Sequence, residues 1–145
     1  MSYINSATSA NIVFILSATG LLAATRLETF SDDDMVSCNE ISLIESGMTA
    51  DGKFWTGIIY EKTNLDITLM PFSPSTLFFD QIYTAQRANQ KSYPIVGEIL
   101  FPSIGKSYTL PEFALEKHTQ MPNAKKILQP QKYTLVGSGL IVKAI

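Results

Sequence analysis

The chain has 145 residues, of which 46% are hydrophobic and 17% are charged, and its formal net charge is −2. This length predicts one domain spanning residues 1–145, and the high apolar content excludes a disordered chain. The acidic net charge argues against a protein that grips nucleic acid by its phosphates, and the single cysteine, Cys38, excludes an internal disulfide and a cysteine-rich zinc site.

The charge is divided unevenly between the two halves of the chain. Residues 1–80 carry three basic and ten acidic side chains, a charge of −7, whereas residues 81–145 carry eight basic and three acidic side chains, a charge of +5. One interpretation is that the halves fold together and their charges neutralise locally. The other is a dipolar subunit that stacks head to tail, because complementary charge sets the register between partners.

The apolar run at residues 10–24 predicts a strand, a turn and a second strand. A secretory signal needs a basic segment before its apolar run, but Arg26 is the first basic residue. The run is also interrupted by polar residues and is too short to span a bilayer comfortably. We therefore expect a strand at residues 12–16, a turn at Ala18-Thr19-Gly20 and a second strand at 21–30.

An acidic break follows this strand pair. Asp32, Asp33 and Asp34 are adjacent like charges, which repel one another unless solvent or a cationic partner surrounds them. The spacing of a calcium-binding EF-hand loop is absent, so no metal is expected here. The segment is interpreted as a solvated loop or as a contact with a basic neighbour.

Residues 41–69 predict a β-hairpin and then a half-buried strand. Strands are expected at 41–46 and 54–61, because Asp51-Gly52 between them is a strong turn signal. Residues 65–69 alternate strictly between apolar and polar types, which indicates a strand with one buried face. Leu65, Ile67 and Leu69 face the core in this prediction, and Asp66 and Thr68 face water or a polar lumen.

The segment after Pro71 predicts the one helix of the chain. Ser73 is the expected N-cap, Pro74 the first helical residue, and Asn89 the left-handed residue that ends the helix. The apolar positions of residues 76–89 recur with helical period, which indicates a helix packed on a sheet rather than a ligand pocket. That stripe consists of Phe78, Phe79, Ile82, Ala85 and Ala88.

The C-terminal third predicts further strands at residues 93–101, 106–113 and 133–142. Five prolines punctuate this part of the chain, and a proline is expected at turns, sheet edges or strand starts because it cannot donate to a sheet ladder. These are Pro94, Pro102, Pro111, Pro122 and Pro130.

No motif of a characterised reaction class is present. The glycines are dispersed, so there is no phosphate-binding loop, and Gly137-Ser138-Gly139 lacks the spacing of a nucleophile elbow. Cys38 and His118 form a nucleophile–base pair only if the fold brings them together, and His118 is expected in a surface loop. We therefore predict no catalytic residue, no cofactor and no metal site.

The order of elements in the middle of the chain resembles the tail tube proteins of contractile-tailed bacteriophages. The resemblance covers about residues 25–100. It consists of the acidic segment 30–34, residues 41–47, the Ala50-Asp51-Gly52 hairpin, an aromatic strand, the strand 65–70 and Pro71-Phe72-Ser73-Pro74-Ser75 opening a helix.

The resemblance implies a mainly β fold in which two packed antiparallel sheets carry one flanking α-helix. It further implies a structural virion protein whose hexameric rings stack into a tube, through which DNA passes into the host without specific binding. Sheath, baseplate and tape-measure proteins are the implied partners. The implied location is the virion, and the implied site of assembly is the host cytoplasm. No membrane is among the implied partners.

Within this resemblance, three groups of residues are candidates for assembly or channel roles. A wall that released DNA should be polar and neutral or acidic, because a basic wall would hold the polyanion. The lumen-facing candidates are Glu40, Ser42, Asp66 and Thr68. The inter-ring candidates are Asp32, Asp33, Asp34, Lys125 and Lys126, and the inter-subunit hairpin tip is Met48, Thr49, Ala50, Asp51, Gly52 and Lys53.

Three alternatives stay open. The tube protein of a type VI secretion system has the same implied fold. A monomeric β-sandwich binding module, for adhesion or carbohydrate binding, would expose aromatic residues such as Trp55 and Tyr60. A small enzyme that uses Cys38 would be inhibited by thiol reagents.

Overall fold

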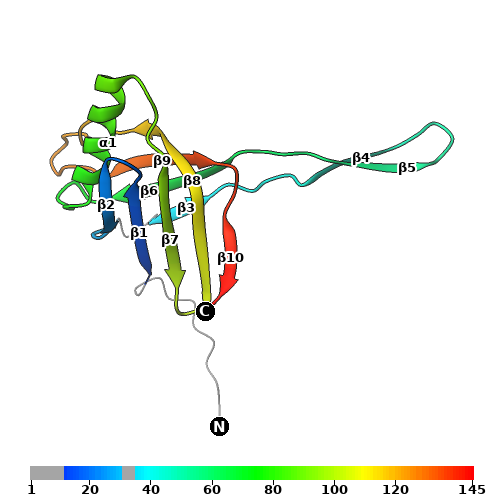
Figure 1. Ribbon diagram of the computed structural model, residues 1–145, viewed down its shortest axis with the longest axis horizontal. Coiled ribbons are helices and arrows are strands. Elements are labelled where there is room, and N and C mark those ends of the chain that lie inside the picture. Colours follow the sequence, from blue (N-terminus) through cyan, green and yellow to red (C-terminus); the bar gives the residue numbers. More distant parts are fainter. Residues whose placement is uncertain (1–11, 31–34) are drawn as a thin grey trace, which may run out of the picture.

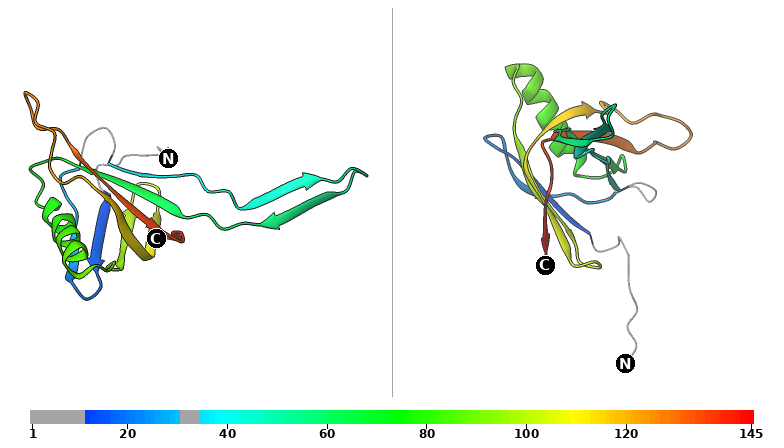
Figure 2. Two further views of the ribbon diagram at one scale, coloured as in Figure 1. Left: turned by 90° about the horizontal axis from the view of Figure 1, so that it is seen from above. Right: turned by 90° about the vertical axis from the view of Figure 1, so that its right-hand side faces the viewer.

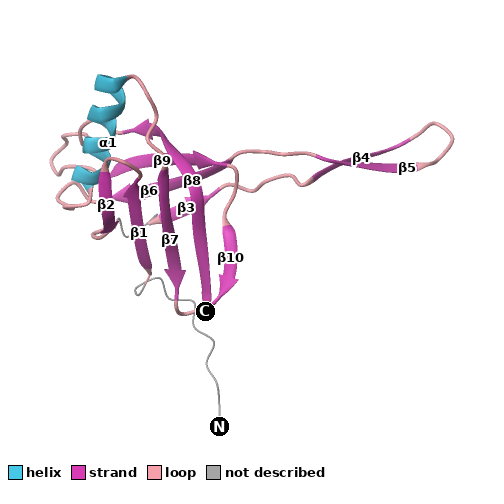
Figure 3. Ribbon diagram, in the orientation of Figure 1, coloured by secondary structure: helices cyan, strands magenta, loops and turns pink. Residues whose placement is uncertain are grey.

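The computed structural model describes residues 12–30 and 35–145 and contains ten strands and one helix over these ranges (Figure 3). Asp32, Asp33 and Asp34 lie outside the described residues. In chain order the elements are β1 (Val13–Ala18), β2 (Leu22–Arg26), β3 (Val36–Cys38), β4 (Ile44–Met48), β5 (Phe54–Ile58), β6 (Thr63–Leu69), α1 (Thr76–Asn89), β7 (Ile95–Phe101), β8 (Lys106–His118), β9 (Gln131–Gly137) and β10 (Ile141–Ala144).

The body of the protein is an eight-stranded antiparallel sheet in the order β2-β1-β7-β8-β9-β6-β3, with β10 paired to β8. One part of the sheet, with β1, β2 and β7, runs crosswise to the part with β3, β6 and β9, so that the sheet forms two layers (Figure 1). A separate two-stranded sheet of β4 and β5 projects from this body. The predicted mainly β fold of two antiparallel sheets and one helix is confirmed.

Strand β8 takes part in both layers, and a proline marks the change. Its first residues pair with β7 and β10, and from Phe113 onward it pairs with β9. The register to β7 shifts between Gly97 and Ile95, opposite Leu110 and Phe113, so Pro111 lies at a bulge inside the strand. The expectation that every proline marks a turn, edge or strand start is wrong here, because a bulge also needs no ladder hydrogen bond.

The core lies between the two layers and the helix. The alternation predicted for β6 is confirmed, since Leu65, Ile67 and Leu69 are buried while the residues between them are half-buried. Helix α1 contributes Phe78, Phe79 and Ile82 to the same core. Other core residues come from β1, β7, β8 and β9, so all the long strands share one hydrophobic cluster.

The helix begins and ends one or two residues later than the sequence predicts. Ser75 is the N-cap and makes no side-chain cap hydrogen bond, and Gln90 is the left-handed C-cap in place of Asn89. Ser73 and Ser75 are buried, and their side chains bind the backbone of Glu28. The Ser73 hydroxyl donates to the Glu28 carbonyl, and the Ser75 hydroxyl oxygen accepts from the Glu28 N–H at 2.9 Å. The two serines thereby dock the start of the helix onto the chain that follows β2.

Several other boundaries differ from the prediction. The second strand ends at Arg26, not at residue 30, and the last predicted strand is split into β9 and β10 by residues 138–140. In the helical stripe, Ala85 is half-buried and Ala88 is exposed, since α1 extends past the edge of the core.

Within the described ranges, no helix has the length and apolar composition to cross a membrane.

Candidate assembly interface

The arm, residues 39–62, projects from the body on the side away from α1 (Figure 2). It consists of β4, β5 and the segments that connect them to β3 and β6. The two strands pair antiparallel, with Ile44 opposite Ile58 and Met48 opposite Phe54. An isolated two-stranded ribbon is at best marginally stable in water, and β4 and β5 pair only with each other over the described residues.

The tip of the arm is the predicted hairpin turn at residues 48–53. The Thr49 N–H donates to the Lys53 carbonyl at 2.8 Å, and the Gly52 N–H donates to the Thr49 carbonyl at 3.0 Å. Gly52 has a φ of 85°, which an L side chain would adopt only with strain. The Thr49 hydroxyl donates to the Asp51 carboxylate and accepts from the Lys53 N–H. The turn is therefore preformed, and its contact with a neighbour stays a prediction.

The two faces of the arm differ in charge. Directly paired residues lie on the same face of an antiparallel ribbon. The apolar face of the arm therefore carries Ile44, Met48, Phe54 and Ile58, separated only by the uncharged Ser46 and Thr56. Glu45 and Trp55 lie on the opposite face, where the Trp55 ring covers Gly47.

Most large apolar side chains of the arm are exposed among the residues that the structure describes. Eight of them are between 42% and 94% exposed: Ile41, Leu43, Ile44, Met48, Phe54, Trp55, Ile58 and Tyr60. A concentration of exposed apolar residues on one projecting element is typical of an interaction surface. The sequence prediction of a hairpin was confirmed, but it did not reveal that the hairpin leaves the body. Residues 41–44 and 58–60 do not alternate strictly between apolar and polar types, and this pattern could have indicated that the hairpin does not lie on the core.

The base of the arm is fastened to the body by polar contacts. The Asn39 side chain accepts from the Asn64 N–H at 2.8 Å and donates to the Lys62 carbonyl at 3.4 Å. Lys62 Nζ lies 3.0 Å from Glu116 Oε2 on β8. These contacts join both strands of the arm to the sheet, so they set the direction in which the arm leaves it.

Two of the predicted lumen-facing residues lie at the base of the arm. Glu40 and Ser42 are exposed and precede β4, which begins at Ile44 and not at residue 41 as predicted. The Ser42 N–H donates to Glu61 Oε2 at 3.1 Å, so this part of the ribbon is joined through a side chain.

The other two, Asp66 and Thr68, lie on β6, on the sheet face opposite the core, and are half-buried. Asp66 accepts from the Thr134 hydroxyl at 2.7 Å and lies 3.5 Å from Lys132 Nζ. This face of β6 and β9 is polar, in agreement with the predicted pattern, while its place in a lumen stays a prediction.

Of the predicted inter-ring residues, the structure describes two. Lys125 and Lys126 are exposed in the connection between β8 and β9. Their predicted acidic partners lie in the segment outside the described residues, and the contact stays a prediction.

The single histidine is buried between helix and sheet. The His118 side chain is 6% exposed, its Nε2 lies 3.2 Å from Asp80 Oδ1, and its ring stacks on Tyr83 at 4.7 Å. The prediction of a surface loop residue is wrong, because His118 ends β8 on the side that packs against α1. Burial lowers the pKa of His118 below its usual 6.5, although the charge of Asp80 opposes this shift.

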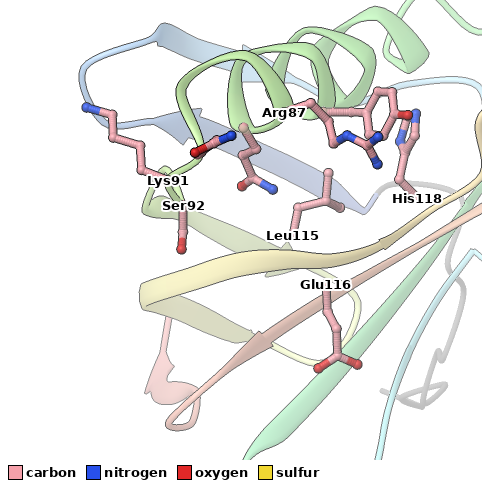
Figure 4. Close-up of a pocket in the computed structure, with 9 residues that line it drawn as sticks. Arg87, Lys91, Ser92, Leu115, Glu116 and His118 are labelled. Atoms are coloured by element: carbon pink, nitrogen blue, oxygen red, sulfur yellow. The ribbon is translucent and has the colours of Figure 1, made fainter.

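A polar groove of about 510 Å³ runs along α1 beside this cluster (Figure 4). Arg87 and His118 lie at one end of the groove, Lys91 and Ser92 at the other, and Leu115 between them. Its lining includes the charged side chains of Arg87, Lys91 and Glu116, so the groove does not match the uncharged apolar face of the arm.

Cys38 and His118 do not form a catalytic pair. Cys38 is on β3 and His118 on β8, with β6 and β9 between them, a separation of roughly 14 Å at the usual strand spacing. Burial and then the charge of Asp66 raise the pKa of the Cys38 thiol, which disfavours the thiolate. In residues 12–30 and 35–145, no group of three or more His, Cys, Asp or Glu side chains could hold a metal ion.

Comparison with known proteins connects this architecture to phage tails and injection machines. A family model described as tail fiber protein gp32 matches residues 5–139. A comparison with curated proteins found no match.

Three solved structures have a similar fold. A chain of the sheath/tube terminator of the PVC extracellular contractile injection system has a TM-score of 0.64 and 18% identity, over 98% of this chain and 100% of that chain. A chain of the PVC sheath-tube complex has a TM-score of 0.62 and 20% identity, over 91% and 88%. A chain of the anti-feeding prophage baseplate has a TM-score of 0.59 and 13% identity, over 99% and 98%.

Proposed function

Because the chain belongs to the tail fiber protein gp32 family, we propose that it is a structural subunit of a contractile phage tail or a related injection system. Within such a tail, its copies form hexameric rings that stack into the tube through which DNA leaves the virion. The sheath, baseplate and tape-measure proteins are its further partners, and it has no catalytic role.

The arm is the observation that supports assembly most directly. It places eight large apolar side chains in water, on a ribbon that has little packing of its own. Contact with neighbouring copies would cover these side chains. The similar folds in sheath–tube, terminator and baseplate structures support a place in the tube or at one of its ends.

Electron microscopy of the purified protein over a range of concentrations tests the proposal. We expect rings or tubes with a central channel, and we expect Phe54→Asp with Ile58→Asp to abolish them, because each change buries a carboxylate in the contact. Leu77→Asp is the matched control, since Leu77 is 61% exposed on α1 and not on the arm.

A dispersed monomer at every concentration, even in the presence of baseplate, would contradict the proposal. It would favour a monomeric binding module that uses the exposed Trp55 and Tyr60. That outcome would also show that the arm variants had no assembly to disrupt.

The polar face of β6 is proposed to line the channel. Asp66 and Thr68 would then present a neutral or acidic wall to passing DNA. Thr68→Lys should make assembled tubes retain DNA at low salt, and the retention should fall steeply as salt is raised. Thr84→Lys, on the exposed face of α1, is the control that should not retain DNA. Equal retention by both variants would place β6 outside the channel.

Contacts between rings are proposed to join the acidic segment Asp32, Asp33 and Asp34 to Lys125 and Lys126 of the next ring. Changing the three aspartates to asparagine should weaken stacking and remove part of its salt sensitivity. Charge reversal of the two lysines to glutamate should have the same effect. Tubes of unchanged length and salt dependence in both variants would disprove this contact.

A further inference from the structure

An apolar pocket of about 370 Å³ opens between the two layers of the body, next to the edge strand β3. Its lining includes Val36, Leu65, Ile99, Phe101, Tyr108 and Leu140. Leu65 and Ile99 belong to the buried core, while the others are partly buried residues packed against it. The pocket is therefore a place where the hydrophobic core reaches the surface.

The pocket and the apolar face of the arm match in chemistry. None of the nine residues that line the pocket is charged. The apolar face of the arm likewise carries no charge over Ile44, Ser46, Met48, Phe54, Thr56 and Ile58. Burying uncharged apolar surface on both sides gains the hydrophobic term without the cost of desolvating an ion.

The arm of the same chain does not fill this pocket. The lining residue Cys38 directly precedes the arm, and Leu65 follows it by three residues, so the pocket lies at the base of the arm. The arm leads away from that base in Figure 1 and in the left view of Figure 2, and the polar contacts of Asn39 and Lys62 join its base to the sheet. The apolar face at the far end of the arm can therefore be buried only against a surface other than this pocket of the same chain.

We propose that the pocket beside β3 receives the apolar face of the arm of a second copy of this chain. This inference rests on the proposed function and identifies the acceptor surface of that assembly. Donor and acceptor are different surfaces of one chain, so each copy gives one arm and receives one. Such a heterologous interface generates closed rings when its rotation closes, and filaments when it does not.

The single native cysteine allows a direct test. Cys38 is exposed at the lining of the pocket and is the one cysteine of the chain. Met48→Cys, Phe54→Cys and Ile58→Cys each add one thiol to the apolar face of the arm. In the assembled protein, a mild two-electron oxidant should join Cys38 of one copy to the arm of the next in at least one variant. Because every chain then has two linkable thiols, the product is a ladder of multimers on a non-reducing gel.

Matched variants separate this contact from accidental oxidation. Glu45→Cys places the thiol on the opposite face of the arm, and Cys38→Ser combined with Phe54→Cys removes the acceptor thiol; both should stop at dimers. A ladder from Glu45→Cys equal to the others, or no ladder from any of the three apolar-face variants, would overturn the proposal.

A second measurement distinguishes failure of this inference from failure of the proposed function. Ile104→Asp places a carboxylate at the lining of the pocket, on a residue that is 48% exposed and thus outside the core. We expect it to abolish rings, as the arm variants do. If Phe54→Asp with Ile58→Asp abolishes rings but Ile104→Asp leaves them intact, the arm docks elsewhere and this proposal is wrong while assembly stands. If the unmodified protein forms no rings but the apolar-face cysteine variants still give the ladder, the contact is real and the tail function is wrong.

Discussion

Replacing Phe79 by alanine tests how the helix is held to the body. Phe79 is fully buried, stacks on Tyr133 with ring centroids 4.3 Å apart, and meets Phe78 edge-on at 5.3 Å. Truncation of a buried phenylalanine costs about 3–5 kcal/mol, because the lost transfer free energy adds to a cavity that the surroundings fill only partly. Two aromatic pairs disappear as well, which favours the upper end of this range.

The expected loss in the free energy of unfolding is therefore about 4–5 kcal/mol, or a fall in melting temperature of roughly 10–20 °C for a chain of this size. Urea unfolding followed by far-ultraviolet circular dichroism measures it. Tryptophan fluorescence does not serve here, because Trp55 lies on the arm and not in the body. The protein must be kept below its assembly concentration, since association would add to the apparent stability.

Phe72→Ala is the control for this measurement. Phe72 lies in the turn before α1 and is 73% exposed, so its truncation should change stability by less than about 0.5 kcal/mol. A loss below about 1 kcal/mol for Phe79→Ala, or equal losses for both variants, would refute the reasoning that α1 is fastened by its buried aromatic side chain.

Three further outcomes follow from buried groups and from the arm. Burial lowers the pKa of His118, so the unfolded chain binds a proton at this histidine at a higher pH than the folded chain does. The free energy of unfolding should therefore fall as pH is lowered from about 7 to 5. His118→Phe should remove this contribution to the pH dependence of the urea midpoint. The Tyr133 hydroxyl is buried and has no hydrogen-bond partner among the described residues. Tyr133→Phe should therefore leave the urea midpoint unchanged or raise it, and a clear fall would reveal a partner. A Cβ at Gly47 would lie 2.7 Å from the Trp55 ring, whereas one at Gly57 would meet nothing, so Gly47→Ala and not Gly57→Ala should shift tryptophan emission without altering the stability of the body.

The sequence determined those elements whose pattern is local. Alternation in residues 65–69 predicted which side chains of β6 are buried, because the pleat alone places successive side chains on opposite faces. Asp51-Gly52 predicted the turn, because the left-handed backbone at Gly52 is a property of that residue. The helical period predicted Phe78, Phe79 and Ile82 as core residues for the same kind of reason.

The sequence also predicted the general class of protein, a component of a phage tail. The order of the hairpin, the alternating strand and the helix led to phage tails, and the family match agrees at that level. It did not separate a tube subunit from other tail components, since such proteins share the fold, and the residues that set position in the tail make contacts outside this chain.

Tertiary structure decided the features that depend on distant partners. Pro111 is tolerated inside β8 because it lies at a bulge, where the register to β7 shifts between Leu110 and Phe113. His118 is buried because the helix, more than 25 residues earlier in the chain, packs over the end of β8. The hairpin became an arm because no other strand of the body pairs with β4 or β5 over the described residues. Each outcome is set by contacts between segments far apart in the chain, and local periodicity carries no information about which segments will meet.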